Sequence, residues 1–117
     1  MPKVEYTHAK GLVQSTGSGF CLGTPAATVT AASSAAALTA SAVILKVDSA
    51  NDAHKVKMPL ATSIGQVIIV TNVDAAQDAV VRNNADDATL CTVGEGVGAI
   101  LVSTATGDNW VPVGLGS

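Results

Sequence analysis

The second half of the chain alternates short runs of Val and Ile with clusters of turn-forming residues. The apolar runs are five to seven residues long, and Gly, Asn or Asp bounds each of them. β-branched runs of this length, interrupted by turns every 8–12 residues or so, are typical of antiparallel strands and not of helices. We therefore predict strands over 66–72, 78–82, 88–93 and 97–103, with a closing apolar strand at 110–113.

Two further strands are predicted upstream by alternation of apolar and polar residues, over 42–47 and 54–58. In the second stretch Val56 and Met58 are expected to point into the core, and the lysines beside them to point out. The run 66–73 differs because it is apolar on both faces along most of its length. This pattern predicts a central strand that is covered on both sides.

The stretch 26–42 is rich in Ala, Ser and Thr, and its pattern is ambiguous. Ala favours helix, whereas Thr28, Val29 and Thr30 favour strand. No amphipathic stripe is long enough to decide between them. We expect a short strand near 27–31, followed by a loop or a single helical turn.

Residues 1–25 form the least regular part of the chain, because glycines and prolines interrupt any periodicity. The stretch nevertheless contains aromatic and aliphatic residues, which are unusual in a disordered linker. We expect an extended N-terminal arm that packs either on a partner or back on its own domain, and the sequence leaves both open. The residues expected to form the contact are Tyr6, His8, Leu12, Val13 and Phe20.

These elements predict an all-β fold, a small antiparallel β-sandwich or flattened barrel of about seven to eight short strands over 26–117, preceded by the arm of 1–25. At 117 residues the chain is expected to form one domain. Its core must come largely from Ala and Val, since there is only one Tyr, one Phe and one Trp. Aromatic side chains bury about 150–250 Å² each, so this core is small. Oligomerisation or docking on a larger body would complete it.

The charge of the chain argues against two classes of partner. The net charge is −3 and only 13% of residues are charged, with no run of Lys or Arg. A nucleic-acid interface or a contact with an anionic membrane would need such a basic patch. The window 35–47 is too short to span a bilayer, which takes about 20 residues, and we expect no secretory signal at the N-terminus.

Candidate chemistry is sparse, and we predict no catalytic residues, cofactor or metal. His8 and His54 are the only imidazoles, and neither has Cys or His at ligand spacing. We interpret His54 as a surface residue at the start of a strand. The glycine-rich segment 94–98 leads into another strand and not into a helix, so a hairpin loop is favoured over a phosphate cradle.

Acidic residues and cysteines also have structural explanations. Asp recurs in the predicted turns without a calcium-loop pattern, so turn formation is favoured over calcium binding. Cys21 and Cys91 are seventy residues apart, and free thiols are favoured over a disulfide. Trp110 is the one residue that stands out. It is interpreted as a core anchor whose indole N–H bonds a loop carbonyl, or alternatively as an anchor of a subunit interface.

From about Ala42 to Gly114 the chain resembles small β domains of tailed-bacteriophage virion proteins. The matching segments are Met58–Ala61, Gly65–Asn72, Ile100–Ser103 and Gly107–Trp110. Such domains occur in head decoration (cement) proteins, head fibres and tail fibres, commonly as trimers. Residues 1–41 are not covered by the resemblance.

The resemblance implies a non-enzymatic structural protein at the capsid surface of a virion, made in the host cytoplasm. Its implied partners are the major capsid protein and further copies of itself, as a homotrimer, with no nucleic acid and no membrane. The short chain and the N-terminal arm favour a decoration protein. A knob of a tail or head fibre that binds a host receptor or glycan is the alternative, although aromatic residues for stacking on sugars are scarce.

Overall fold

The computed structural model describes residues 3–7, 11–16 and 22–115, with side chains described over 22–114. These residues form strands, turns and loops, with no helix among them, so the predicted all-β class is confirmed. Within the described ranges there is accordingly no apolar helix of the length needed to cross a bilayer. The strands are β1 (Lys3–Thr7), β2 (Gly11–Thr16), β3 (Val29–Thr30), β4 (Ala36–Ala37), β5 (Ile44–Asp48), β6 (Lys55–Lys57), β7 (Val67–Asn72), β8 (Ala79–Arg82), β9 (Thr89–Val93), β10 (Gly98–Ser103) and β11 (Trp110–Leu115).

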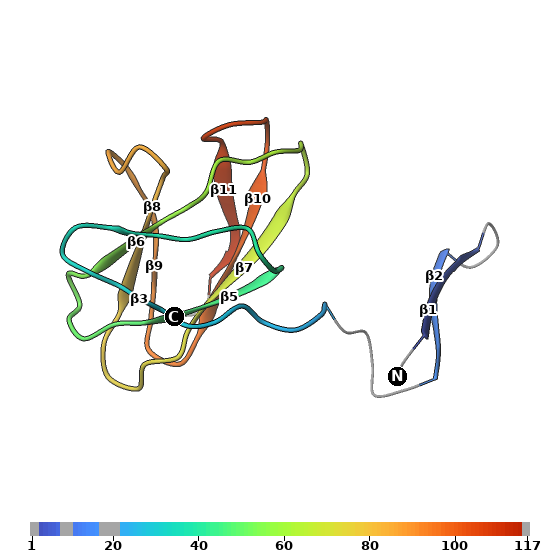
Figure 1. The fold of residues 1–117 in the computed structure, drawn as a ribbon, viewed down its shortest axis with the longest axis horizontal. Coiled ribbons are helices and arrows are strands. Elements are labelled where there is room, and N and C mark those ends of the chain that lie inside the picture. The colour runs from blue at the N-terminus through green and yellow to red at the C-terminus, as the bar shows by residue number, and fades with distance from the viewer. Residues whose placement is uncertain (1–2, 8–10, 17–21, 116–117) are drawn as a thin grey trace.

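Nine of these strands form two mixed sheets (Figure 1). The five-stranded sheet has the order β11-β10-β7-β5-β3, and the four-stranded sheet has the order β4-β6-β8-β9. Neither sheet closes into a barrel in the described part of the chain, since each sheet has two different edge strands. All eight predicted strands from 27–31 onward are present, with small shifts at their ends. The additional strand β4 replaces the predicted loop or helical turn.

The pairing corrects the expectation of an antiparallel fold. From β3 to β8 the chain passes from one sheet to the other at every step, so successive strands of one sheet run parallel: β3 with β5, β5 with β7, β4 with β6, and β6 with β8. Only the last strands reverse within a sheet, in the pairs β8–β9, β7–β10 and β10–β11. A parallel pair needs a long crossover, and here the crossover is a strand of the opposite sheet.

One hydrophobic core lies between the two sheets. Leu45, Ile68, Val70 and Leu101 contribute to it from the five-stranded sheet, and each is at most 2% exposed. The four-stranded sheet contributes a second layer, consisting of Val56, Ala79, Val81, Cys91 and Val93. The expected inward position of Val56 and Met58 is confirmed, since both are fully buried. Alternation along each strand thus builds the core from small branched residues.

A buried amide joins the two sheets where β7 ends. Asn72 is 2% exposed. Its Nδ2 donates to the backbone carbonyls of Gln77, at 2.7 Å, and of Val93 in β9, at 3.1 Å. Its Oδ1 accepts the backbone N–H of Asp74 at 3.1 Å. A buried polar group costs little stability when it is fully bonded in this way, and the bonds fix the crossing from β7 to β8.

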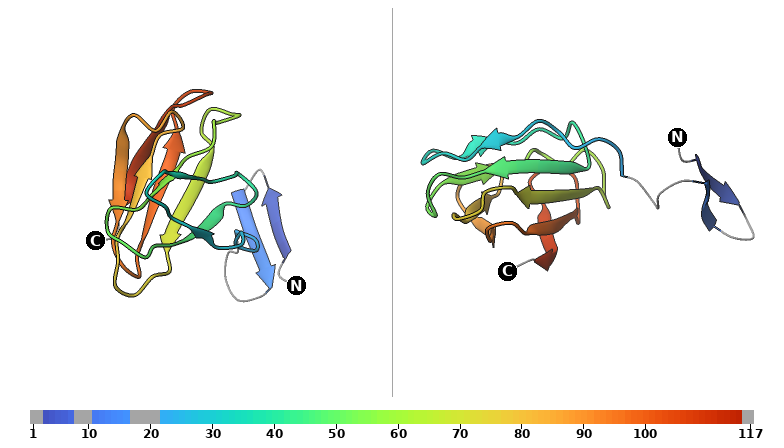
Figure 2. Two further views of the ribbon diagram at one scale, coloured as in Figure 1. Left: turned by 60° about the vertical axis from the view of Figure 1, so that its left-hand side comes forward. Right: turned by 90° about the horizontal axis from the view of Figure 1, so that it is seen from below.

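The N-terminal stretch is more regular than predicted. β1 and β2 pair as an antiparallel hairpin, with Tyr6 opposite Leu12 and Glu5 opposite Val13. Figures 1 and 2 show this hairpin clear of the two-sheet body, beyond the side on which β5, β7 and β10 lie. A lone two-stranded hairpin is marginally stable in water. The hairpin is therefore expected to gain stability from a contact outside itself.

Candidate interaction surface

The outer face of the five-stranded sheet carries an apolar patch that crosses β5, β7, β10 and β11, with Lys46 and Thr71 as polar neighbours farther along β5 and β7. Residues of β5, β7, β10 and β11 that alternate with the core residues point away from the core, and cross-strand pairing aligns them in two rows. The first row is Val111, Val102 and Val67; the second is Ile100, Ile69 and Ile44. We call these six residues the Val/Ile face.

This face is open to solvent in the described structure. Val67, Ile100 and Val111 are 41–43% exposed, and the other three members are half-buried. Val113, in the irregular part of β11, is 62% exposed at the margin of the face. The prediction that 66–73 is covered on both sides is therefore wrong. β7 is central in its sheet, but only its inner face, with Ile68 and Val70, is buried.

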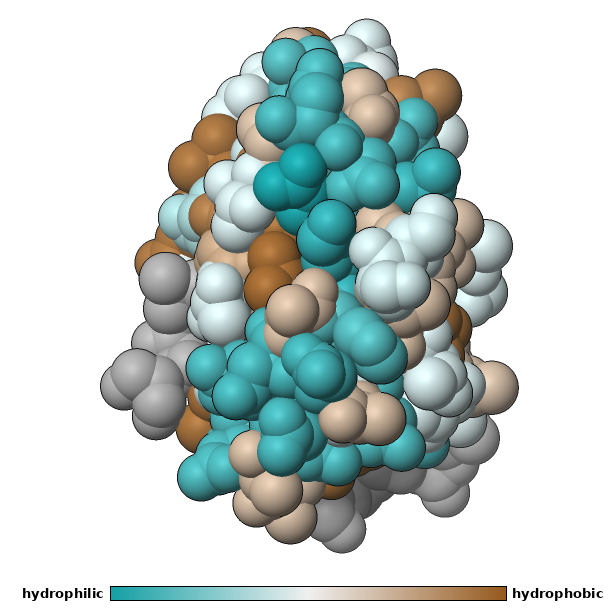
Figure 3. All heavy atoms as spheres, turned by 90° about the vertical axis from the view of Figure 1, so that its left-hand side faces the viewer, coloured by the Kyte–Doolittle hydropathy of each residue, from teal (hydrophilic) through white to brown (hydrophobic). Residues whose placement is uncertain are grey.

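The outer face of the four-stranded sheet has a different composition. Its outward positions include Lys55 and Lys57 on β6, Arg82 on β8 and Thr92 on β9, together with the apolar residues Ala37 on β4 and Val80 on β8. Figure 3 shows the side of the molecule on which β6, β8 and β9 lie, and hydrophilic residues predominate there. Solvated polar side chains are expected on the free face of a sheet that contacts water.

Trp110 closes one end of the core. It is 4% exposed, and its Nε1 donates a hydrogen bond of 2.8 Å to the carbonyl of Pro59. Because Trp110 begins β11 and Pro59 follows β6, this bond joins the two sheets. The geometry agrees with the core-anchor interpretation, including the predicted bond to a loop carbonyl. The interface-anchor interpretation stays a prediction.

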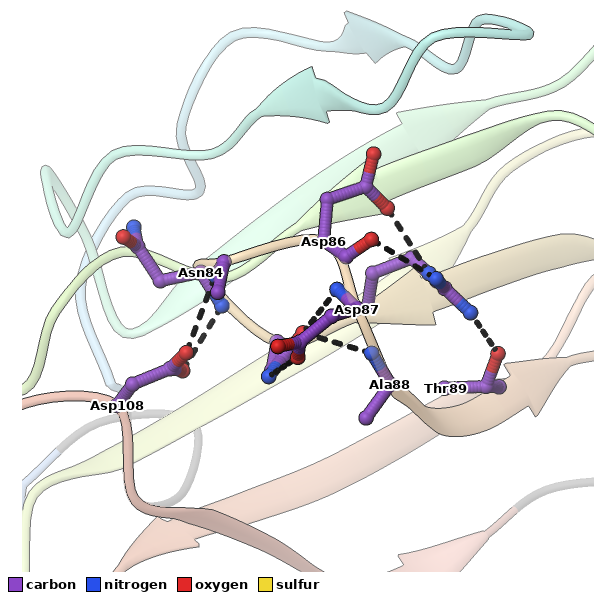
Figure 4. A network of polar contacts seen from close by, with 9 residues as sticks. Asn84, Asp86, Asp87, Ala88, Thr89 and Asp108 are labelled. Carbon is purple, nitrogen blue, oxygen red and sulfur yellow. Dashed lines mark hydrogen bonds and ion pairs between the residues drawn. The ribbon is translucent and has the colours of Figure 1, made fainter.

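A polar network holds the loop between β8 and β9 at the same end (Figure 4). The Arg82 guanidinium donates to Asp86 Oδ1 and to the Asp86 carbonyl, both at 2.9 Å, and to Thr89 Oγ1 at 2.6 Å. Asp86 has a positive φ of 57°, a backbone conformation that residues other than Gly rarely adopt. The two bonds from Arg82 to the carboxylate and the carbonyl of Asp86 stabilise this conformation. Asn83 Oδ1 also accepts the backbone N–H groups of Asp87 and Ala88.

Asp108 connects this loop to the turn between β10 and β11. Its Oδ1 accepts the backbone N–H of Asn84 at 2.8 Å, and its Oδ2 accepts that of Ala85 at 3.1 Å. Asn84 Nδ2 in turn donates to the carbonyl of Met58 at 2.9 Å. Three loops from distant parts of the sequence are thus held together by a single carboxylate and a single amide. Hydrogen bonds to a charged acceptor are the stronger kind.

The predicted arm residues fall partly on the described hairpin. Tyr6 lies on β1, and Leu12 and Val13 lie on β2. His8 and Phe20 lie outside the described residues. The predicted contact role of the arm is therefore supported only by the position of the hairpin, which stands apart from the Val/Ile face and from the core.

The turn aspartates bind backbone or neighbouring side chains, as expected of turn-forming residues. Asp74 Oδ1 accepts the backbone N–H groups of Ala76, at 2.7 Å, and Gln77, at 2.6 Å. These two bonds hold the pKa of Asp74 below its ordinary value. Asp52 Oδ1 accepts the backbone N–H of Asp78 at 2.8 Å. Over the described ranges, no group of three His, Cys, Asp or Glu residues is placed to hold a metal ion.

The remaining candidates for chemistry lie apart from one another. His54 is half-buried at the start of β6, and its backbone carbonyl accepts the N–H of Val80. A cavity of about 190 Å³ lies beside β3 and β5, where small apolar and hydroxyl side chains and no ionisable group line it. The glycine-rich segment 94–98 joins β9 to β10 across the two sheets, so the predicted hairpin is wrong. The predicted positive φ is confirmed at Gly96, where it is 66°.

Cys91 is a core residue. It lies on β9, is 6% exposed and carries a free thiol, whose pKa burial raises. A raised pKa reduces the thiolate fraction, and thiolate is the reactive form. Cys21 lies outside the described residues.

The Val/Ile face is the feature that sequence reasoning missed. The signal was present, because the run 66–73 and the run 97–103 both carry apolar residues on both faces. We interpreted the first as a strand buried within its own domain. The same pattern is expected of a strand whose second face is covered by another molecule.

Comparison with known proteins adds no further identification. No protein-family model, no curated protein and no solved structure matches the chain.

Proposed function

We propose that this protein is a non-enzymatic structural subunit of a bacteriophage virion that binds the outside of the capsid as an oligomer and stabilises the head. The observation that carries the proposal is the β1–β2 hairpin, which stands clear of the body (Figures 1 and 2). The resemblance of 42–114 to small virion β domains gives the class of particle. We assign the body itself to the small β-sandwiches, since one core lies between its two sheets.

The hairpin is the element best placed to reach a coat subunit. Nine residues separate its last residue, Thr16, from Ala26, whose backbone N–H donates to the carbonyl of Ile44 in the body. A chain of nine residues can span up to about 30 Å when extended. The hairpin can therefore bind a neighbouring molecule while the body rests elsewhere on the particle.

Stabilisation of the head would be mechanical. Each copy would bury apolar surface across the junction of coat subunits, and a standard stable contact buries about 800 Å² on each partner. Copies linked in an oligomer bind with higher avidity than single copies. Expansion of the shell by packaged DNA would then have to break several contacts together.

Addition of the purified protein to undecorated heads tests the proposal. We expect binding in a fixed ratio to the major capsid protein, and an increased resistance of the heads to heat. A variant lacking residues 2–20 should lose binding while its buried Trp110 still reports a folded body. The double variant Tyr6→Ser/Leu12→Ser, which changes one cross-strand pair of the hairpin, should also bind weakly.

Thr7→Ser is the matched control on the same hairpin and should bind as the original protein does. Normal decoration by the truncated chain would refute the role of the hairpin. Reproducible binding to host glycans, together with no binding to heads, would favour the receptor-binding fibre knob instead.

A further inference from the structure

The Val/Ile face has the composition of a sheet interior although it lies on the outside of the body. We propose that this face is the contact between copies of this chain, with the faces of two or three copies packed together around a common axis. The inference rests on the oligomer of the proposed function and names its contact surface, whereas binding to the capsid is tested separately by the decoration of heads.

The two sides of β5, β7 and β10 carry similar apolar residues. The inner side of β5, β7 and β10 carries Leu45, Ile68 and Leu101, which pack on the second sheet. The outer side carries Ile44, Ile69 and Ile100, aligned across the same strands. Sheets with such faces pack on other sheets about 10 Å apart. The outer side therefore fits another apolar sheet, and a second copy of the chain supplies one.

The outer face of the four-stranded sheet of a neighbouring copy does not fit against the Val/Ile face. That outer face presents Lys55, Lys57 and Arg82. Burial of an unpaired ammonium or guanidinium group against Val and Ile is strongly unfavourable, because the charge loses its hydration. The Val/Ile face of one copy is therefore expected to contact the Val/Ile face of another copy. Such contacts form a closed oligomer around an axis and not a filament.

The strands that carry the Val/Ile face limit the area of the contact. Four strands about 4.8 Å apart, with six residues that rise about 3.4 Å each, give a face of about 19 by 20 Å. Two copies would then bury about 800 Å² in total, which is below the size of a standard stable interface. The contact is therefore expected to be weak. It also explains how a chain with few aromatic residues gains additional buried surface.

The experiment measures the mass of the full-length protein in solution by sedimentation over a range of concentrations. We expect two or three times 11.6 kDa for the original chain. Ile100→Lys places like charges at the centre of the contact and should raise the dissociation constant at least about tenfold. Val80→Lys, at an outward position of the four-stranded sheet, is the matched control and should leave the mass unchanged.

Fluorescence of Trp110, the only Trp, verifies that each variant is folded. Should Ile100→Lys fail to fold, Ile69→Thr gives a second, milder test at the middle of the face. A monomeric original chain would overturn the proposal, as would equal masses for the original chain and a folded Ile100→Lys variant. Dissociation on removal of residues 2–20, with no effect of Ile100→Lys, would overturn it too, because the arm would then hold the copies together.

Discussion

The outer faces of the two sheets differ although their inner faces are alike. Inside, both sheets contribute Val, Ile, Leu and Ala to one core. Outside, the four-stranded sheet presents mainly lysines, Arg82 and threonines, whereas the five-stranded sheet presents two aligned rows of Val and Ile, with Lys46 and Thr71 beside them. A face that contacts water needs polar side chains, and a face that contacts protein does not. The comparison therefore distinguishes a polar outer face from an apolar outer face on the same small body, and we propose that the apolar face is the contact between copies.

The largest expected effect concerns the residue that joins the two sheets. Trp110→Ala removes a buried indole and its bond to the Pro59 carbonyl, and should lower the free energy of unfolding by about 3–5 kcal/mol. Urea denaturation followed by circular dichroism measures this. Trp110→Phe keeps an aromatic ring without the N–H donor and should cost less. A loss below about 1 kcal/mol for Trp110→Ala would contradict the anchoring role.

Two neighbouring residues of β7 provide the second test. Ile68 is 1% exposed and faces the core, whereas Ile69 lies on the Val/Ile face. Ile68→Ala should cost about 2–5 kcal/mol in unfolding free energy, and Ile69→Ala less than about 1 kcal/mol under conditions where the protein is monomeric. Equal losses in the monomer would mean that the same chain covers the Val/Ile face. That result would favour an arm that packs back on its own domain.

Alternation along the chain was sufficient to predict most strands and their buried sides. Val56 and Met58 are buried as expected, and Trp110 bonds a loop carbonyl as expected. These features depend on a local period of two residues and on the chemistry of one side chain. Such features can therefore be predicted from a few neighbouring residues of the sequence.

Features that depend on pairing over long distances could not be predicted. β4 pairs Ala36 with Val56, twenty residues later in the chain, and nothing in an Ala-rich stretch specifies that partner. A turn such as 48–52 can reverse the chain within one sheet or carry it to the other sheet, and its residues are the same in both cases. The pattern of 66–73 shows two apolar faces and does not show what covers the second.

A smaller effect is expected at the carboxylate that holds three loops together. Asp108→Ala removes the acceptor of the Asn84 and Ala85 N–H groups, and should lower the free energy of unfolding by about 1–3 kcal/mol. Thermal unfolding measures the loss. Asp87→Ala, an exposed change in the same network, should cost less. Because these loops lie at one end of both sheets, the oligomeric state should not change. An altered mass for Asp108→Ala would mean that this end contributes to the contact between copies.

The smallest expected effect is on the pH dependence of stability, which is expected to differ from the pH dependence of association. Backbone N–H groups of Ala76 and Gln77 lower the pKa of Asp74 in the folded protein. The folded state thus binds this proton less readily than the unfolded state does, so the stabilisation is present above the ordinary value of 3.8 and is lost as the pH falls below it.

Denaturation curves at a series of acidic pH values should show a shallower loss of stability for Asp74→Asn than for the original chain. Glu95→Gln removes one exposed carboxylate and controls for the change in net charge. None of the six residues of the Val/Ile face is ionisable, and the charged residue beside them on the same side of the sheet is Lys46. The association constant should therefore be unchanged between about pH 5 and 8, a range in which free Lys and carboxyl groups do not change charge. Association that weakens with acid in this range would place a titrating group in the contact, which would then have to extend beyond the two rows of Val and Ile.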